Sequence, residues 1–188
     1  KNIGAVNTVV REDNKWVGYN TDCSGAIMAL EACTSLKNKN ILILGSGGTA
    51  KAIGHGIKQK GGILTVTYNR NKDRAEFLAN ELECELIACH DAGTRPIDIL
   101  INCSPVGMSP KINETPFLAR DLRREMIVFD VVYNPLETKL IREAKAVGCK
   151  VILGSELFIN QAVQQFELWT GQTAPAEVMR ETLIEQLC

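Results

Sequence analysis

The sequence predicts an α/β fold of the Rossmann type, a doubly wound and mostly parallel β-sheet with helices on both faces. Strand-like and helix-like stretches alternate along most of the chain. The strand-like stretches are almost continuously apolar, which is typical of parallel strands covered on both faces. Residues 41–44 are such a run, and they lead through a glycine-rich turn into a helix-like stretch at 51–60.

Composition and charge exclude several classes of protein. With 188 residues, 45% hydrophobic and 23% charged, the chain can bury one core, or one core and a small appendage. A net charge of −1 predicts no general attraction to nucleic acid or to a membrane. The seven scattered cysteines form no C-x-x-C pair and there are two histidines, which favours free thiols in the cytoplasm over structural zinc. A plastid is the alternative for a plant source.

The order of elements begins outside the sheet. Residues 4–10 and 15–19 are predicted strands separated by a polar turn, and a helix from Thr21 or Asp22 runs to about residue 35. After the strand at 41–44, the predicted strands are 63–68, 85–88, 98–102, 126–131 and 150–153. The predicted helices are 51–60, 72–82, 138–146, 155–170 and 175–187.

The glycine-rich turn has the spacing of a dinucleotide site. The first glycine, Gly45, permits a tight turn, and Gly47 lets the backbone approach phosphate oxygens, while small Ala50 allows close packing of helix on strand. The helix N-terminus offers unpaired N–H groups to an anion. A purely structural turn is the alternative. The predicted contacts are Gly45, Ser46, Gly47, Gly48, Thr49 and Ala50.

The end of the next strand favours NADP over NAD. An acidic residue about 20 positions after the glycines usually binds the ribose 2′-hydroxyl of NAD. Here Asn69 and Arg70 occupy that position, with Arg74 one helical turn further. Arginine offers a planar fork for a 2′-phosphate. A pair of solvated arginines at a helix start is the alternative.

Several ordered motifs together resemble shikimate dehydrogenases. They are Gly4-Ala5-Val6-Asn7-Thr8, Gly18-Tyr19-Asn20-Thr21-Asp22, the turn at Gly45, Asn69-Arg70 with Arg74, Asn102 to Met108, Tyr133-Asn134-Pro135, and Gly154 with Gln161-Ala162. The stretch 156–161 is most similar to the dehydrogenase half of bifunctional dehydroquinate dehydratase/shikimate dehydrogenases. This resemblance covers essentially the whole chain.

The resemblance implies an oxidoreductase that reduces 3-dehydroshikimate with NADPH in the shikimate pathway of aromatic amino acid and chorismate biosynthesis. It implies a remnant of a substrate-binding domain at 1–22, a hinge helix at 23–37, an NADP-binding Rossmann domain at 38–170, and a carboxy-terminal helix at 171–188 packing back toward the hinge. The family's catalytic lysine is expected upstream of Lys1, the first residue of the chain. The chain alone is then expected to bind NADP(H) and to turn over shikimate poorly.

The resemblance also assigns residue roles. Asp22 matches the catalytic aspartate, although by itself it reads equally well as a helix cap. Asn7, Thr21, Gln161 and Tyr133 match substrate-binding positions, and Leu157 stands where many relatives have methionine. The remaining matches are cofactor-binding: Ser104, Val106, Met108, Val131 and Gly154.

Two other functions stay open. A quinate/shikimate dehydrogenase that uses NAD is disfavoured because no acidic residue stands at Asn69 or Arg70. A non-catalytic nucleotide-binding or regulatory module is disfavoured because it has no use for Asn7, Asp22 and Gln161. The predicted partner is a small-molecule substrate, and the oligomeric state is left open.

Overall fold

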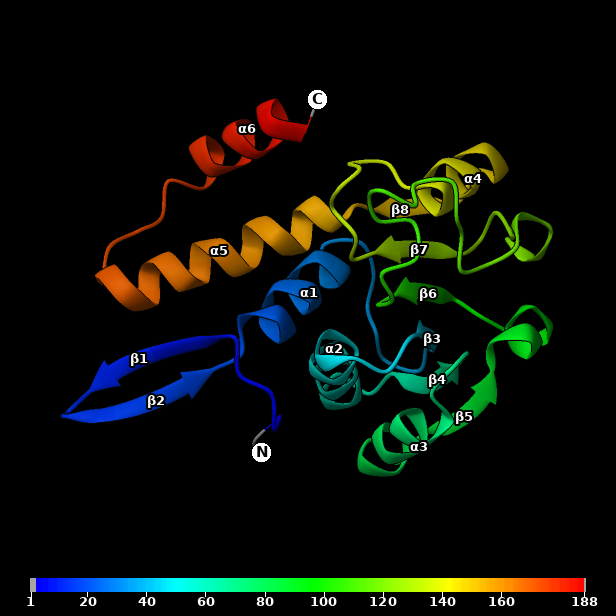
Figure 1. The fold of residues 1–188 in the computed structure, drawn as a ribbon, viewed down its shortest axis with the longest axis horizontal. Helices are drawn as coiled ribbons and strands as arrows, with labels where there is room; N and C mark the ends of the chain where they lie inside the picture. Colours follow the sequence, from blue (N-terminus) through cyan, green and yellow to red (C-terminus); the bar gives the residue numbers. More distant parts are fainter. Residues whose placement is uncertain (1–2, 188) are drawn as a thin grey trace.

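The computed structural model describes residues 3–187 as a six-stranded parallel sheet with a separate two-stranded hairpin (Figure 1). The hairpin consists of β1 (Thr8–Glu12) and β2 (Lys15–Tyr19). The sheet consists of β3 (Asn40–Leu44), β4 (Ile63–Tyr68), β5 (Glu85–Ala88), β6 (Ile99–Asn102), β7 (Ile127–Asp130) and β8 (Lys150–Ile152). The helices are α1 (Thr21–Glu31), α2 (Gly48–Gln59), α3 (Lys72–Glu81), α4 (Lys139–Val147), α5 (Gly154–Thr170) and α6 (Ala176–Leu187).

The strand order, β5-β4-β3-β6-β7-β8, is that of a doubly wound fold. The chain starts in the middle at β3, adds β4 and β5 on one side, and then crosses to β6 on the other. Every neighbouring pair in this sheet is parallel. The predicted fold class is confirmed, and the reversal between β3 and β6 is the point at which such sheets bind ligands.

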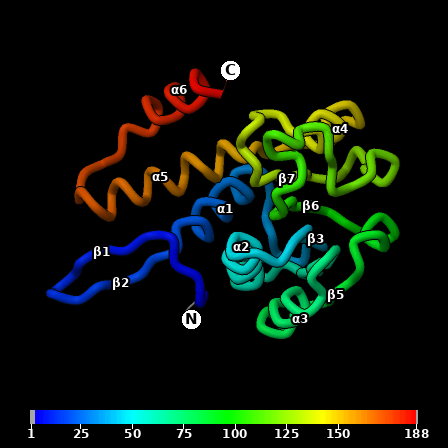
Figure 2. Tube along the Cα trace, in the orientation of Figure 1, coloured from blue at the N-terminus to red at the C-terminus, as the bar shows by residue number. Residues whose placement is uncertain are grey.

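Successive side chains along each strand point to opposite faces of the sheet, and helices cover both faces. Ile41 and Ile43 belong to a buried cluster with residues of α1, α2 and α5. Leu42 and Leu44 belong to a second cluster with residues of α4. Figure 2 follows the chain from the hairpin through α1 into β3, so that α1 joins the two parts of the molecule.

The hairpin and the first helix differ in their bounds from the sequence prediction. The first strand begins at Thr8 instead of residue 4, because Gly4 has a positive φ of 68° that interrupts the extended chain. The turn is the residue pair Asp13 and Asn14, both with positive φ, as two-residue hairpin loops require. Helix α1 ends at Glu31 and not near residue 35.

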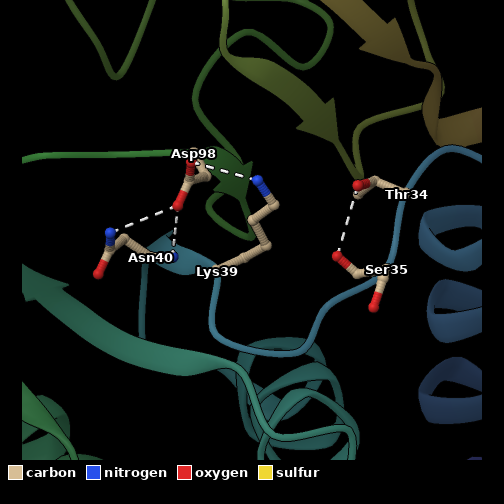
Figure 3. A network of polar contacts seen from close by, with 5 residues as sticks. All are labelled: Thr34, Ser35, Lys39, Asn40 and Asp98. Atoms are coloured by element: carbon tan, nitrogen blue, oxygen red, sulfur yellow. Dashed lines mark hydrogen bonds and ion pairs between the residues drawn. The ribbon is translucent and has the colours of Figure 1, made fainter.

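A polar network ties β3 to β6 at their amino ends (Figure 3). One carboxylate oxygen of Asp98 accepts hydrogen bonds from the Asn40 N–H at 2.8 Å and from the Asn40 side-chain amide at 3.4 Å. The Lys39 ammonium lies 3.6 Å from the other oxygen. The network lies at the edge of the sheet opposite to the carboxyl ends, and it fixes the register of the two central strands there.

Helix α5 is bonded to three other elements, namely α1, the hairpin and α6. Its Asn160 side chain donates to the Gly25 carbonyl of α1 at 3.0 Å, and the Trp169 indole donates to the Val9 carbonyl of the hairpin at 3.2 Å. Helix α6 packs against α5 through an ion pair between Arg180 and Glu156, 2.6 Å apart. Among the described residues, no helix is long and apolar enough to cross a membrane.

The packing of α1 predicts a clear difference between two substitutions on that helix. Leu30 is completely buried, whereas Met28 is 54% exposed. We expect Leu30→Ala to lower the free energy of unfolding by about 2–5 kcal/mol because it removes buried apolar surface and leaves a cavity. Met28→Ala should change it by less than about 0.5 kcal/mol. Urea denaturation measures both, and equal losses would contradict the described burial of α1.

Candidate active site

The glycine-rich turn connects β3 to α2 at the carboxyl edge of the sheet. Gly45 has a φ of +111°, and a Cβ at this residue would lie 3.1 Å from the Cys103 carbonyl oxygen. Gly47 is the N-cap of α2 and has no side chain to occupy the N–H groups of the first turn. Ala50 is fully buried against the core. The predicted strand, turn and helix are confirmed, and the helix begins at Gly48 instead of residue 51.

A cleft of about 660 Å³ opens beside this turn. Three cationic side chains and one carboxylate line it, namely Arg70, Lys111, Lys139 and Glu114. The predominance of positive charge suits a phosphorylated ligand. Its other lining residues are Leu44, Gly45, Thr67, Asn69, Cys89, Ser104, Val106, Thr115 and Pro116.

The two predicted arginines both lie near the glycine turn. Arg70 lines the cleft itself. The Arg74 guanidinium lies 3.9 Å from the position that a Cβ on Gly47 would occupy, and Asn71 caps the helix that carries it by accepting from the Arg74 N–H at 2.9 Å. Thus a phosphate beside the turn can reach guanidinium groups from the end of β4 and from the first turn of α3.

A smaller cavity of about 270 Å³ contains Asp22 together with residues from the far end of the chain. It brings together three predicted residues, Asp22, Tyr133 and Gln161, although more than 110 positions separate the first from the second. Gly154 and Val131 also line it, and so do Thr49, Leu157 and Phe158. The Tyr133 and Phe158 rings stack with centroids 4.6 Å apart.

Asn7 holds the Asp22 carboxylate in place, and Thr21 orients Asn7. The Asn7 side-chain amide donates to the Asp22 carboxylate at 2.9 Å and to the Thr21 hydroxyl at 3.0 Å. Its oxygen accepts from the Thr21 N–H at 2.9 Å and from the Thr8 hydroxyl at 2.9 Å. The amide therefore has protein partners for all its polar atoms, so a substrate contact at Asn7 must replace one of them.

Burial raises the pKa of the Asp22 carboxyl, and the hydrogen bond from Asn7 opposes this shift. Its helix is capped by the neighbouring Asn20, whose side chain accepts from the Cys23 N–H at 3.0 Å. Asp22 therefore does not serve as the N-cap of α1. Among residues 3–187 no Lys or Arg forms an ion pair with it.

Two loops at the ends of β6 and β7 separate the large cleft from the Asp22 cavity. Ser104 and Met108 of the first loop and Val131 and Tyr133 of the second line a third cavity of about 400 Å³. Ser104 is shared with the large cleft, and Val131 and Tyr133 are shared with the Asp22 cavity. The three cavities therefore adjoin one another along these two loops.

Sequence reasoning missed several residues of the cleft wall. Lys111, Thr115 and Pro116 belong to a long loop after β6 that folds back over the cleft, and no local pattern marks that return. Lys139 reaches the cleft from the first turn of α4. Asn102 belongs to one of the sequence motifs without an assigned role, and Asp130 belongs to none, although each is a polar residue that ends an apolar strand.

Asn102 and Asp130 are fully buried and form a hydrogen-bond network beneath the two loops. The Asn102 amide donates to one Asp130 carboxylate oxygen at 2.9 Å, and the same oxygen accepts from the Val132 N–H at 3.1 Å. The Thr138 hydroxyl donates to the other oxygen at 2.6 Å. Burial raises the pKa of Asp130 from 3.8 to about 6, although these three hydrogen bonds lower it.

The fold and site define a dinucleotide-binding domain whose cofactor cleft leads to a partly buried carboxylate, which is the arrangement of a dehydrogenase. Residues 154–184 match the family model described as the shikimate 5′-dehydrogenase C-terminal domain. The chain is 41% identical to shikimate dehydrogenase (NADP+) of Methanocaldococcus jannaschii, covering 98% of this chain and 69% of that protein. The chain therefore belongs to the shikimate dehydrogenase family.

Solved structures agree with this assignment. A crystal structure of a shikimate dehydrogenase in complex with NADP+ superimposes with a TM-score of 0.92 at 40% identity, covering 99% of this chain and 68% of that one. The Thermus thermophilus enzyme in complex with NADP(H) and shikimate gives a TM-score of 0.86 at 34% identity, covering 97% of this chain and 69% of that one.

The raised pKa of Asp130 predicts a specific dependence of stability on pH. Its folded value of about 6 lies above the ordinary value of 3.8, so the folded state binds the proton more tightly. The associated stabilisation is complete below about pH 4 and is lost as the pH rises to about 6, on the order of 3 kcal/mol. Asp130→Asn removes this titration. The difference in unfolding free energy between the two proteins, measured by urea denaturation from pH 4 to 7, should follow this course, and a constant difference would contradict it.

Proposed function

We propose that this chain supplies the cofactor cleft and the catalytic aspartate for the NADP-linked reduction of 3-dehydroshikimate to shikimate. One observation carries the proposal: the Arg70 cleft at the glycine turn and the Asp22 cavity both adjoin a third cavity, which is lined by the loops that end β6 and β7. The family relationship to NADP-dependent shikimate dehydrogenases supports the same substrate and cofactor.

The residues present fit NADP. Gly45 lets the turn pack against the backbone of Cys103, and Gly47 places no side chain before the start of α2, where the unoccupied N–H groups would bind the diphosphate oxygens. Arg70 and Arg74 would bind the 2′-phosphate, each with a planar guanidinium. Ser104, Val106, Met108, Val131 and Gly154 would enclose the nicotinamide half. When bound, NADPH supplies the hydride that the carbonyl carbon of the substrate accepts.

Asp22 acts where the carbonyl oxygen gains a proton. As the hydride reaches the carbon, negative charge develops on the oxygen and a donor beside it must supply H+. We propose that a lysine from outside residues 3–187 gives this proton and that Asp22 keeps the lysine charged and oriented. The absence of an ion-pair partner for Asp22 among the described residues is consistent with this arrangement.

Gln161, Asn7 and Tyr133 would contact the substrate. Gln161 and Tyr133 line the same cavity as Asp22. Asn7 would exchange one of its present hydrogen bonds for a substrate hydroxyl. Thr21 is only 2% exposed, so its hydroxyl would act chiefly by orienting Asn7.

The rival functions have less support. An NAD-dependent quinate/shikimate dehydrogenase would be favoured by a carboxylate at the end of β4, where Asn69 and Arg70 stand. A regulatory module that only senses a nucleotide gives no reason for a cavity that contains both Asp22 and Gln161.

The free thiols of the described cysteines favour a reducing compartment such as the cytoplasm.

Arg70 should distinguish NADP from NAD. Arg70→Ala removes a guanidinium from the cleft, and we expect it to weaken NADP+ binding about tenfold or more, because a charge-assisted bidentate contact is lost. NAD+ lacks the 2′-phosphate, so its affinity should change by less than about twofold. Isothermal titration calorimetry measures both. Arg120→Ala, an exposed arginine outside the cleft, is the matched control. Tighter binding of NAD+ than of NADP+ by the unmodified chain would contradict the cofactor assignment.

Asp22 should be needed for turnover and not for cofactor binding. In a protein that contains the proposed lysine, we expect Asp22→Asn to lower kcat for shikimate oxidation by about 100-fold or more, the usual range for removing acid-base assistance. Its affinity for NADP+ should remain within about twofold. Asp13→Asn in the exposed hairpin turn is the control, because asparagine tolerates the positive φ there. Near-normal kcat for Asp22→Asn would remove Asp22 from the mechanism.

A further inference from the structure

The loops 103–109 and 131–134 lie between the cofactor cleft and the Asp22 cavity. Both are held by hydrogen bonds from the ends of β6 and β7. Backbone pairing joins them directly, since the Ser109 N–H donates to the Asn134 carbonyl at 3.1 Å. The side-chain hydrogen bonds that β6 and β7 make to these loops come from Asn102 and Asp130. Asp130 is completely buried and lines none of the three cavities. It therefore cannot touch a ligand in this conformation.

Asn102 connects Asp130 to the first loop. Its amide nitrogen donates to Asp130 and, at 3.2 Å, to the Val106 carbonyl. Its oxygen accepts from the Ser104 N–H at 3.0 Å and from the Ser104 hydroxyl at 2.6 Å. All four hydrogen-bonding positions of the amide are used, so its orientation is fixed by its partners.

Asp130 is connected to the second loop through the backbone. The Val132 N–H donates to it directly, and the Val132 carbonyl lies against Gly154. A Cβ on Gly154 would lie 2.3 Å from that oxygen, so the start of α5 fits against the loop with no spare room. The position of Val132 is thus set from one side by Asp130 and from the other by α5.

We infer that Asp130 is a positioning residue for the nicotinamide end of the cofactor: it locks the two loops at a fixed separation without contacting the ligand. Two observations favour this over a role in general stability alone. It accepts hydrogen bonds from Val132 of the second loop, from Asn102, which holds the first loop, and from the helix cap Thr138. Among the described residues it has no cationic partner, so its carboxylate serves as an acceptor for these groups.

The test compares two ligands that share one half. The inference rests on the proposed NADP site, so affinity is measured for NADP+ and for 2′-phospho-ADP-ribose, which lacks the nicotinamide. We expect Asp130→Ala to weaken NADP+ about tenfold and to leave 2′-phospho-ADP-ribose within about twofold. Asp130→Asn should behave like the unmodified chain, because its amide oxygen can accept from Asn102 and Val132 while its nitrogen donates to the Thr138 hydroxyl.

A matched control and a second variant keep the test decisive. Asp98→Ala removes another strand-linking aspartate, at the opposite edge of the sheet (Figure 3), and should leave both affinities unchanged. Where Asp130→Ala does not fold, as judged by circular dichroism, Asn102→Ala breaks only the connection to the first loop and should show the same selective loss for NADP+.

The other possible outcomes contradict either the positioning role of Asp130 or the proposed function. Equal weakening of both ligands by the folded variant, or no weakening, contradicts the positioning role while leaving the NADP site intact. Equal affinity of the unmodified chain for both ligands shows that the loops do not hold the nicotinamide, which also overturns the inference. Failure of the unmodified chain to bind either ligand contradicts the proposed function itself.

Discussion

The pairing of β3 with β6 is the constraint on which the rest of the structure depends. These strands are consecutive neighbours in the sheet, with Leu44 opposite Asn102, yet the chain leaves them in different directions. From β3 it enters the glycine turn and α2, and from β6 it enters the long loop after Asn102. Because the two departing segments separate, a cleft opens between them at the carboxyl ends of the strands.

That divergence explains the glycine at residue 45. The turn after β3 must bend at once, and it does so against the backbone of Cys103 and Ser104, which follow the neighbouring strand β6. A side chain there would meet the Cys103 carbonyl and would require a backbone conformation that L-residues rarely adopt. The cofactor site is therefore a consequence of strand order, and the glycine is the residue that makes the order compatible with close packing.

The same row of strand ends carries the buried polar network. Leu44, Asn102 and Asp130 end three adjacent strands and lie side by side in register. An unpaired carboxyl in this position would be costly, because burial disfavours the charged form. Hydrogen bonds from Asn102, Val132 and Thr138 offset part of that cost and at the same time join loops that are distant in sequence.

Much of this architecture could be predicted from the sequence, because it depends on local signals. Continuous apolar runs identify the strands of the sheet, and the glycine spacing after Leu44 identifies the turn. The resemblance to shikimate dehydrogenases also selects Asp22 and Gln161, which the fold brings into one cavity. The loop that carries Lys111 could not be predicted, since its return over the cleft depends on tertiary contacts. The early end of α1 and the two-residue turn at Asp13 and Asn14 could not be predicted either.

The most direct test of the central claim is a crystal structure of this chain with NADP+. We expect the diphosphate of NADP+ at the N-terminus of α2 over Gly47 and the 2′-phosphate within hydrogen-bond distance of the Arg70 guanidinium. The nicotinamide should lie between Ser104 and Val131. NADP+ bound away from the β3–β6 strand ends, or in the reverse orientation with its nicotinamide beside Arg70, would contradict the central claim.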